Sequence, residues 1–219
     1  MAAVLPVGAY DAGPATAAPV TWALSIACVA ATGLSVLHPD VLVLGSVVPA
    51  TVWAGAPGAL PPGVSLATAP WLHGSALHLV YNLAALWVFG PPVERRLGSA
   101  RFAAFALATG ALALAAQAAS MPGSTTPVFG ASGMTAACLG AFLVAHERAR
   151  VSIALVFLTV PVPVRVLAAV WLAGELLTVA AAAVGWIPPA PVAHVAHLTG
   201  FVLGAAILRF LTTKRLFAF

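Results

Sequence analysis

Ser132 is the residue of this sequence best placed to act as a nucleophile. It lies between Ala131 and Gly133, where a polar loop gives way to an apolar helix predicted over residues 132–146. A serine at that point can cap the helix by accepting a hydrogen bond from a backbone N–H group, and small neighbours allow close helix packing in lipid. It can also attack a carbonyl that approaches over those small neighbours. The second interpretation requires a base and an oxyanion site at the same depth.

Three other polar residues are predicted at the depth of Ser132. Helical rise places Ser132 about 21 Å from the inner, charged end of its helix. The same count places His197 and Asn82 about 18 Å, and His78 about 24 Å, from the inner ends of theirs. Since the hydrocarbon layer is about 30 Å thick, the four side chains share one level below the outer surface. Polar groups at such depth cluster around a cavity or around each other.

The serine and histidine at this level form the pair needed for nucleophilic catalysis. His197 is the expected general base for Ser132. Glu175 lies ten residues beyond Arg165, about 15 Å from the inner end of a different helix, so we expect no carboxylate at the level of the imidazole. The sequence therefore predicts a serine–histidine dyad rather than a triad. For Glu175 we expect either a hydrogen bond to a neighbouring hydroxyl or an influence on the movement of its own helix.

The remaining polar residues at this level carry hydrogen-bond donors. His78 and Asn82 are four residues apart and share one helix face. With the backbone N–H of Ser132, they can form an oxyanion hole. A small-residue face at Gly200 and Gly204, one turn from His197, predicts close approach of that helix to the small residues of the serine helix. Those small residues are Gly133, Ala136, Ala137 and Gly140.

A metal site is the other interpretation of the histidines. His194 lies three residues before His197, and His73 lies near His78. Neither pair has a cysteine or carboxylate partner at the expected depth, which a typical zinc site would require. We therefore expect no metal and no cofactor.

The composition requires that these residues lie in a membrane protein. Of 219 residues, 62% are hydrophobic and only 6% are charged, which is incompatible with a soluble domain of this length. Cys28 and Cys138 lie in apolar runs and are expected to be core residues, with no disulfide between them. We predict an all-α polytopic bundle of six transmembrane helices, over residues 20–37, 71–93, 101–120, 132–146, 166–186 and 192–212.

The remaining segments divide the chain into three parts. Residues 1–19 are expected to form a flexible tail, residues 20–212 the membrane domain, and residues 213–219 a short basic tail. Residues 38–70, rich in Pro and Gly, are expected to form a long loop in the membrane interface. Residues 151–160 are apolar but too short to cross, so they either lie in the interface or extend the fourth helix.

The basic residues predict the orientation of the chain. All nine Lys and Arg residues lie on the side reached after an even number of crossings. By the positive-inside rule, that side is cytoplasmic, and both termini of this multi-pass cell-membrane protein lie inside. The net charge of +4 therefore reflects contact with anionic lipid headgroups and does not indicate nucleic-acid binding.

The sequence resembles the rhomboid intramembrane serine proteases over residues 71–212. Four motifs, in order along the chain, carry the resemblance. They are Gly130-Ala131-Ser132-Gly133, Ala196-His197-Leu198-Thr199-Gly200, the spaced set His73, His78 and Asn82, and the turn Glu94-Arg95-Arg96-Leu97-Gly98. The sequence departs from many members of the family at two places. Trp53 is followed by Ala54 rather than Arg, and Ala136 occupies a position that is often aromatic.

The resemblance implies a fold and a reaction. It implies a six-helix rhomboid-like bundle in which Ser132 is the nucleophile, His197 is the base, and His78 and Asn82 help to bind the oxyanion. The reaction implied is hydrolysis of a peptide bond in single-pass or multi-pass membrane proteins, near the outer face, without metal or cofactor. Two alternatives remain open: an inactive relative that binds transmembrane clients, and a transporter with a polar site at the midplane.

Overall fold

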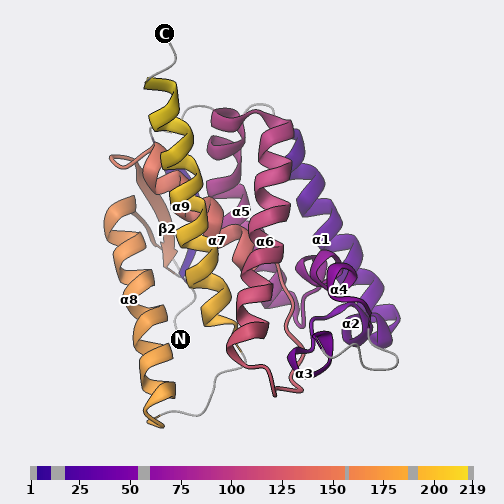
Figure 1. Ribbon diagram of the computed structural model, residues 1–219. Coiled ribbons are helices and arrows are strands. Elements are labelled where there is room, and N and C mark those ends of the chain that lie inside the picture. Colours follow the sequence, from indigo (N-terminus) through magenta and orange to yellow (C-terminus); the bar gives the residue numbers. More distant parts are fainter. Residues whose placement is uncertain (1–3, 11–17, 54–59, 156–157, 187–191, 217–219) are drawn as a thin grey trace.

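The computed structural model describes residues 4–10, 18–53, 60–155, 158–186 and 192–216 of the chain. Six helices form its main body (Figure 1). Their bounds are α1 Pro19–Leu37, α5 Ala76–Leu97, α6 Ser99–Ser120, α7 Ser132–Ala145, α8 Val164–Ala183 and α9 His194–Leu216. All except α7 are long and apolar enough to cross a membrane, whereas α7 has 14 residues. The chain is therefore a mostly helical, multi-pass membrane protein.

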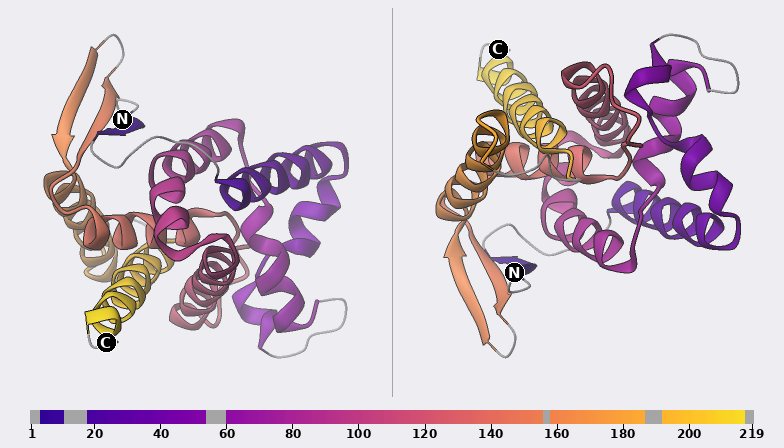
Figure 2. Two further views of the ribbon diagram at one scale, coloured as in Figure 1. Left: turned by 90° about the horizontal axis from the view of Figure 1, so that it is seen from above. Right: turned by 90° about the horizontal axis from the view of Figure 1, so that it is seen from below.

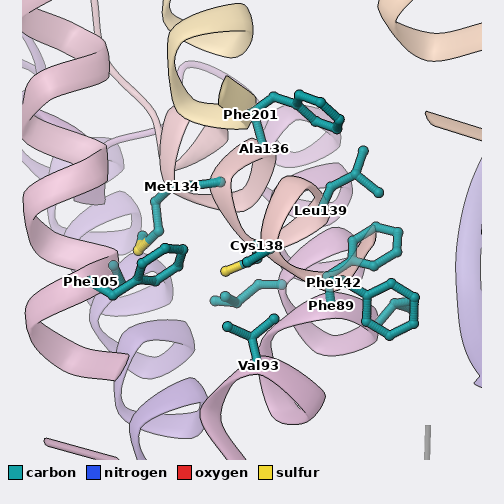
Figure 3. Close-up of a cluster of buried hydrophobic side chains, with 14 of the residues drawn as sticks. Phe89, Val93, Phe105, Met134, Ala136, Cys138, Leu139, Phe142 and Phe201 are labelled. Atoms are coloured by element: carbon teal, nitrogen blue, oxygen red, sulfur yellow. The ribbon is translucent and has the colours of Figure 1, made fainter. Parts of the chain in front are cut away.

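Helix α7 lies in the middle of this bundle. It packs against α5, α6, α8 and α9, and every residue from Gly133 to Phe142 is buried. Figure 3 shows part of the interior around α7, where Met134, Cys138 and Phe142 contact side chains from the surrounding helices. The two cysteines, Cys28 and Cys138, are buried free thiols, as the sequence predicted. A short central helix enclosed by longer ones places its first residue, Ser132, inside the protein.

Glycine positions allow α7 and α9 to touch through their backbones. A Cβ atom added at Gly200 would overlap the carbonyl oxygen of Gly133, and one at Gly204 would overlap that of Ala137. From the other side, a Cβ at Gly140 would overlap the backbone of α9. The small-residue packing predicted between these helices is therefore confirmed.

Helix α5 differs from its prediction at both ends. It begins at Ala76 rather than at residue 71, because the Ser75 hydroxyl caps it by accepting from the backbone N–H of His78 at 3.1 Å. The helix was predicted to end at residue 93, but it continues past Pro91 and Pro92 to Leu97. This stretch is buried in the bundle, and close packing keeps a helix intact where prolines have removed backbone donors.

The carboxylate of Glu94 joins three helices at the inner end of α5. It is almost completely buried and accepts hydrogen bonds from the backbone N–H groups of Val20 and Thr21, at 3.0 and 2.8 Å, and from the hydroxyls of Thr21 and Ser99, both at 2.8 Å. These donors lie in the first turns of α1 and α6, where backbone N–H groups have no partner within the helix. Glu94 thus ties both helix starts to α5.

The segment expected to be a long loop contains four short helices in its described residues, 38–53 and 60–70, the last of which extends to Trp71. They are α2 Pro39–Gly45, α3 Pro49–Val52, α4 Pro62–Thr68 and the 3₁₀ helix η1 Ala69–Trp71. Each carries a proline in its first two positions, where a missing N–H costs nothing and the fixed φ favours the helix. The prolines interpreted as loop residues are therefore helix-start signals.

A three-stranded sheet corrects the all-α expectation. Strand β2 (Arg150–Leu155) pairs antiparallel with β3 (Leu158–Pro163), and β1 (Val4–Tyr10) pairs antiparallel with β2. Residues 151–160 were expected in the interface or as an extension of the fourth helix, and residues 4–10 in a flexible tail. Strand pairing satisfies backbone groups that a short apolar segment would otherwise leave unpaired. Figure 2 shows the sheet on one side of the bundle, next to α8, and the short helices on the other.

Candidate active site

Ser132 is the first residue of α7, and a bend in the backbone leads into it. Ala131 occupies the capping position, so Ser132 lies inside the helix and does not cap it. Two residues earlier, Gly130 has φ = +119°, and its N–H donates to the carbonyl oxygen of Ala69 at 2.9 Å. A Cβ atom at Gly130 would lie 2.8 Å from Cε1 of the His78 ring. Glycine is required here both by the backbone conformation and by the histidine beside it.

One cavity joins the predicted site residues. Its volume is about 1060 Å³, and Ser132, His197, His78 and Asn82 all line it. These residues come from α7, α9 and α5, so the shared depth predicted from helical rise corresponds to a shared cavity. The wall is mostly apolar, as in a typical ligand or substrate cavity with a few polar groups. Among the described residues, Ser132 and His197 are not joined by a hydrogen bond.

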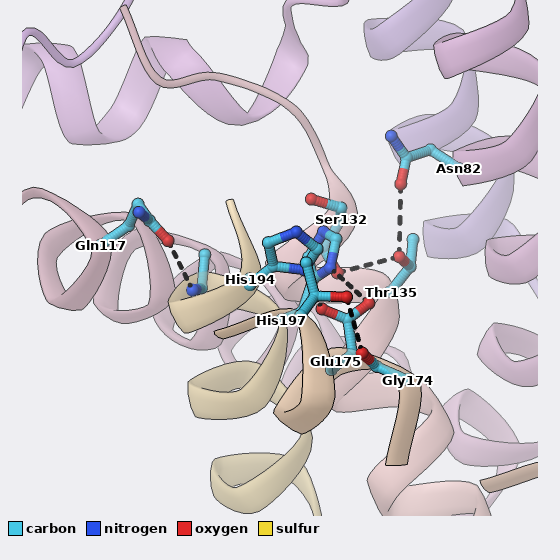
Figure 4. A network of polar contacts seen from close by, with 10 residues as sticks. Asn82, Gln117, Ser132, Thr135, Gly174, Glu175, His194 and His197 are labelled. Atoms are coloured by element: carbon cyan, nitrogen blue, oxygen red, sulfur yellow. Dashed lines mark hydrogen bonds and ion pairs between the residues drawn. The ribbon is translucent and has the colours of Figure 1, made fainter. Parts of the chain in front are cut away.

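The imidazole of His197 has a carboxylate partner, contrary to the expectation from sequence. Its Nδ1 lies 3.0 Å from Oε1 of Glu175, and Nδ1 of His194 lies 2.6 Å from Oε2 of the same group (Figure 4). All three side chains are between 11% and 17% exposed. A carboxylate accepts from an N–H group, so both histidines carry a proton on Nδ1. In a neutral imidazole with its proton on Nδ1, Nε2 is proton-free and able to accept a proton from a nucleophile.

The depth estimated from helical rise did not predict that the carboxylate of Glu175 contacts His197. It placed this residue about 15 Å from the inner end of α8, only 3 to 6 Å lower than His197 and Ser132. A glutamate side chain is long enough to span that difference. The expectation that no acid lies near the histidines, used to reject both a triad and a metal site, was therefore wrong. In the sequence, the feature that indicated this contact was an acidic residue, Glu175, inside a predicted transmembrane helix.

Asn82 has a donor available to the cavity. The hydroxyl of Thr135 lies 3.4 Å from Oδ1 of Asn82 and 3.0 Å from the carbonyl oxygen of Ser132, and these two acceptors share its single proton. The Nδ2 group of Asn82 is buried and has no hydrogen-bond partner in the part of the chain that the structure describes. An added Cβ at Gly130 would lie 3.9 Å from it, so it lies close to the bend before Ser132. A buried amide without an acceptor is suited to binding a developing negative charge.

His73 supports this arrangement from outside the cavity wall. It is 2% exposed, and its Nδ1 lies 3.1 Å from the hydroxyl of Thr32. Its ring packs edge-on against that of His78, with centroids 4.9 Å apart. Burial lowers the pKa of His73 to about 4, and the neighbouring His78 contributes to the lowering. His73 is therefore neutral at neutral pH and fixes the position of the His78 ring by packing.

Gln117, which the sequence analysis did not identify, holds the beginning of α9. Its Oε1 accepts from the backbone N–H of Ala196 at 3.1 Å, and both residues are buried. The first N–H groups of a helix have no partner inside it. Gln117 supplies a hydrogen-bond acceptor to the turn that carries both His194 and His197. An amide inside an apolar helix was the available signal.

An aromatic ring lies near His197, although position 136 is Ala. Trp171 of α8 has its ring centroid 6.1 Å from that of His197 and 5.9 Å from that of Phe201. Ala136 and Trp171 both line the cavity. The space left by the small residue on α7 is thus bordered by a large one on α8, which limits how the imidazole can turn.

Comparisons with known proteins agree with these motifs. A family model described as the Rhomboid domain matches residues 63–214. Rhomboid protease GluP of Bacillus subtilis (strain 168) is 44% identical over 72 residues, which are 33% of this chain. The matched segment covers only 14% of the length of GluP. Because the family model covers most of the chain, including all four motifs, this protein belongs to the rhomboid family.

Proposed function

We propose that this protein is an intramembrane serine endopeptidase that acts through Ser132, His197 and Glu175. The observation that carries this proposal is the contact of Glu175 with Nδ1 of His197, in a cavity that Ser132 also lines. Serine, imidazole and carboxylate in this order form a nucleophile, a base and a group that orients the base. The proposed unit is thus a triad that replaces the dyad expected from sequence.

The chemistry begins with proton transfer. Nε2 of His197 takes the proton of the Ser132 hydroxyl as the oxygen attacks a peptide carbonyl. The imidazole becomes positively charged, and the carboxylate of Glu175 stabilises this charge without taking the proton itself. His197 then gives the proton to the leaving amine, and water hydrolyses the acyl-enzyme through the same base. Apo geometry is compatible with this role, because catalytic hydrogen bonds often form only once substrate is bound.

The negatively charged oxygen of the tetrahedral intermediate requires hydrogen-bond donors in the cavity. Nδ2 of Asn82, the ring of His78 and the backbone N–H of Ser132 are the proposed oxyanion donors. The positive end of α7 adds a favourable field at its first residue. In a cavity with mostly apolar walls, such donors are worth more than in bulk water.

The proposed substrates are single-pass or multi-pass membrane proteins. The site lies within the helical bundle, and its cavity reaches exposed residues at Thr126 and Val192. Thr126 lies in the α6–α7 connection, on the side expected to be external from the distribution of Lys and Arg. We therefore propose cleavage near the outer face of the cell membrane, with both termini in the cytoplasm and lipids around the bundle.

A cleavage assay tests this proposal directly. Protein purified in detergent is incubated with a generic transmembrane substrate, and products are followed on gels. The intact chain should cleave, Ser132→Ala should not, and Ser120→Ala, at the end of α6, should cleave normally. Equal cleavage by Ser132→Ala would reject the nucleophile. A lack of cleavage by the intact chain across several substrates would favour the inactive client-binding relative.

A further inference from the structure

Glu175, His194 and His197 form a cluster of three side chains. The proposed protease chemistry uses Glu175 and His197 but not His194. One ligand atom from each lies within 4.8 Å of the others. The two histidines are three residues apart on α9 and share a face, while the carboxylate comes from α8 and touches both rings (Figure 4). Catalysis needs only one of these histidines. His194 is half-buried, and its buried Nε2 atom has no hydrogen-bond partner among the residues that the structure describes.

The donor set matches one class of ion. Two imidazoles and one carboxylate are a common ligand set for Zn²⁺, with a fourth position left for water. Tetrahedral bonds of about 2.0 to 2.1 Å separate neighbouring ligands by about 3.3 Å. The carboxylate of Glu175 already lies 2.6 and 3.0 Å from the two Nδ1 atoms. Only small movements of side chains are needed, and α8 is lightly packed, with Val164 and Ala168 its buried residues.

We propose that this cluster binds a zinc-class divalent cation and that the bound ion inhibits the enzyme. The ion replaces the two protons between the carboxylate and the Nδ1 atoms of His194 and His197. Each neutral imidazole then carries its proton on Nε2. Nε2 of His197 is thereby converted from an acceptor to a donor and cannot take the proton of Ser132. The inhibition rests on the proposed protease function, whereas the binding of the ion does not.

Zinc binding can be measured without any catalytic activity. Isothermal titration of ZnCl₂ into Ser132→Ala protein, in detergent and free of chelators, should show one ion per chain. Adding His194→Gln or Glu175→Gln to this background should each weaken binding at least about tenfold, since even groups that only support a ligand have effects of that size. His38→Gln, an exposed histidine beyond α1, is the matched control and should leave the affinity unchanged.

The outcomes separate the two proposals. Absence of zinc binding by the Ser132→Ala protein at millimolar concentration, or unchanged affinity in both cluster variants, would overturn the metal site. Because Glu175→Gln preserves side-chain shape, it decides the matter if His194→Gln does not fold. With active protein, Zn²⁺ should inhibit cleavage, and His194→Gln should require at least about tenfold more Zn²⁺. A chain that binds zinc at this cluster but never cleaves would reject only the protease proposal.

Discussion

Glu175 determines which ring nitrogen of His197 carries a proton. Its oxygen can only accept from Nδ1, so Nε2 is left free for the nucleophile. The sequence allowed Ser132, His197, His78 and Asn82 to be placed together, because each lies on a helix of predictable rise. It did not reveal this contact, because the direction of a long side chain and the tilt of α8 are set by packing between helices.

Replacing Glu175 by Gln distinguishes a triad from a dyad. The amide preserves shape but loses the negative charge and can hold the wrong tautomer of His197. The corresponding change in a serine protease triad costs about 10⁴ in kcat. We expect kcat to fall at least about tenfold here, and Glu175→Gln should cause little further loss when it is added to His197→Ala, since residues that act as a unit are not additive. Unchanged kcat in Glu175→Gln would restore the dyad.

Asn82 should act on the transition state more than on the substrate. Removing one oxyanion donor typically lowers kcat by about 10²–10³-fold, and the loss in Asn82→Ala should be near the lower end because other donors remain. Steady-state kinetics should show this fall with little change in KM, and the melting temperature should remain nearly unaltered. His78→Ala should behave likewise. A raised KM at constant kcat would indicate uniform substrate binding, and a large fall in melting temperature would indicate a structural role.

At the scale of elements, the contact of α7 with α9 sets the distance between Ser132 and His197. Gly204→Ala places a Cβ against the backbone at Ala137, and overpacking of this kind costs about 1–3 kcal/mol. We expect a lower melting temperature and reduced cleavage. The control is Gly33→Ala on α1, where an added Cβ meets nothing within 4 Å. Equal stability of both variants would contradict the close packing of α7 and α9.

The elements differ in how much the sequence revealed about them. The long helices were predictable because about twenty apolar residues in lipid have few alternatives to a helix. The sheet was not, because β1 pairs with β2 across about 140 residues of sequence, as in the pair Tyr10 and Arg150. The short helices were missed because a proline signals a helix start as readily as a loop.

For the whole molecule, the charges and the site predict where cleavage occurs. Figure 1 shows α9 ending on the opposite side of the bundle from the end of α8. The basic residues near the ends of α5 and α9 should face the cytoplasm. A reporter fused after Phe219 should therefore behave as cytoplasmic, and one inserted at Ser124 as external. Reversed reporter signals would place cleavage on the cytoplasmic side.

The central claim is that His197 activates Ser132. A fluorophosphonate reacts with an activated serine and needs no knowledge of the substrate, so its labelling rate measures this claim most directly. The account predicts that the intact chain is labelled at Ser132, that Ser132→Ala is not labelled, and that His197→Ala is labelled at least about 10²-fold more slowly. Labelling of His197→Ala at the rate of the intact chain would contradict it.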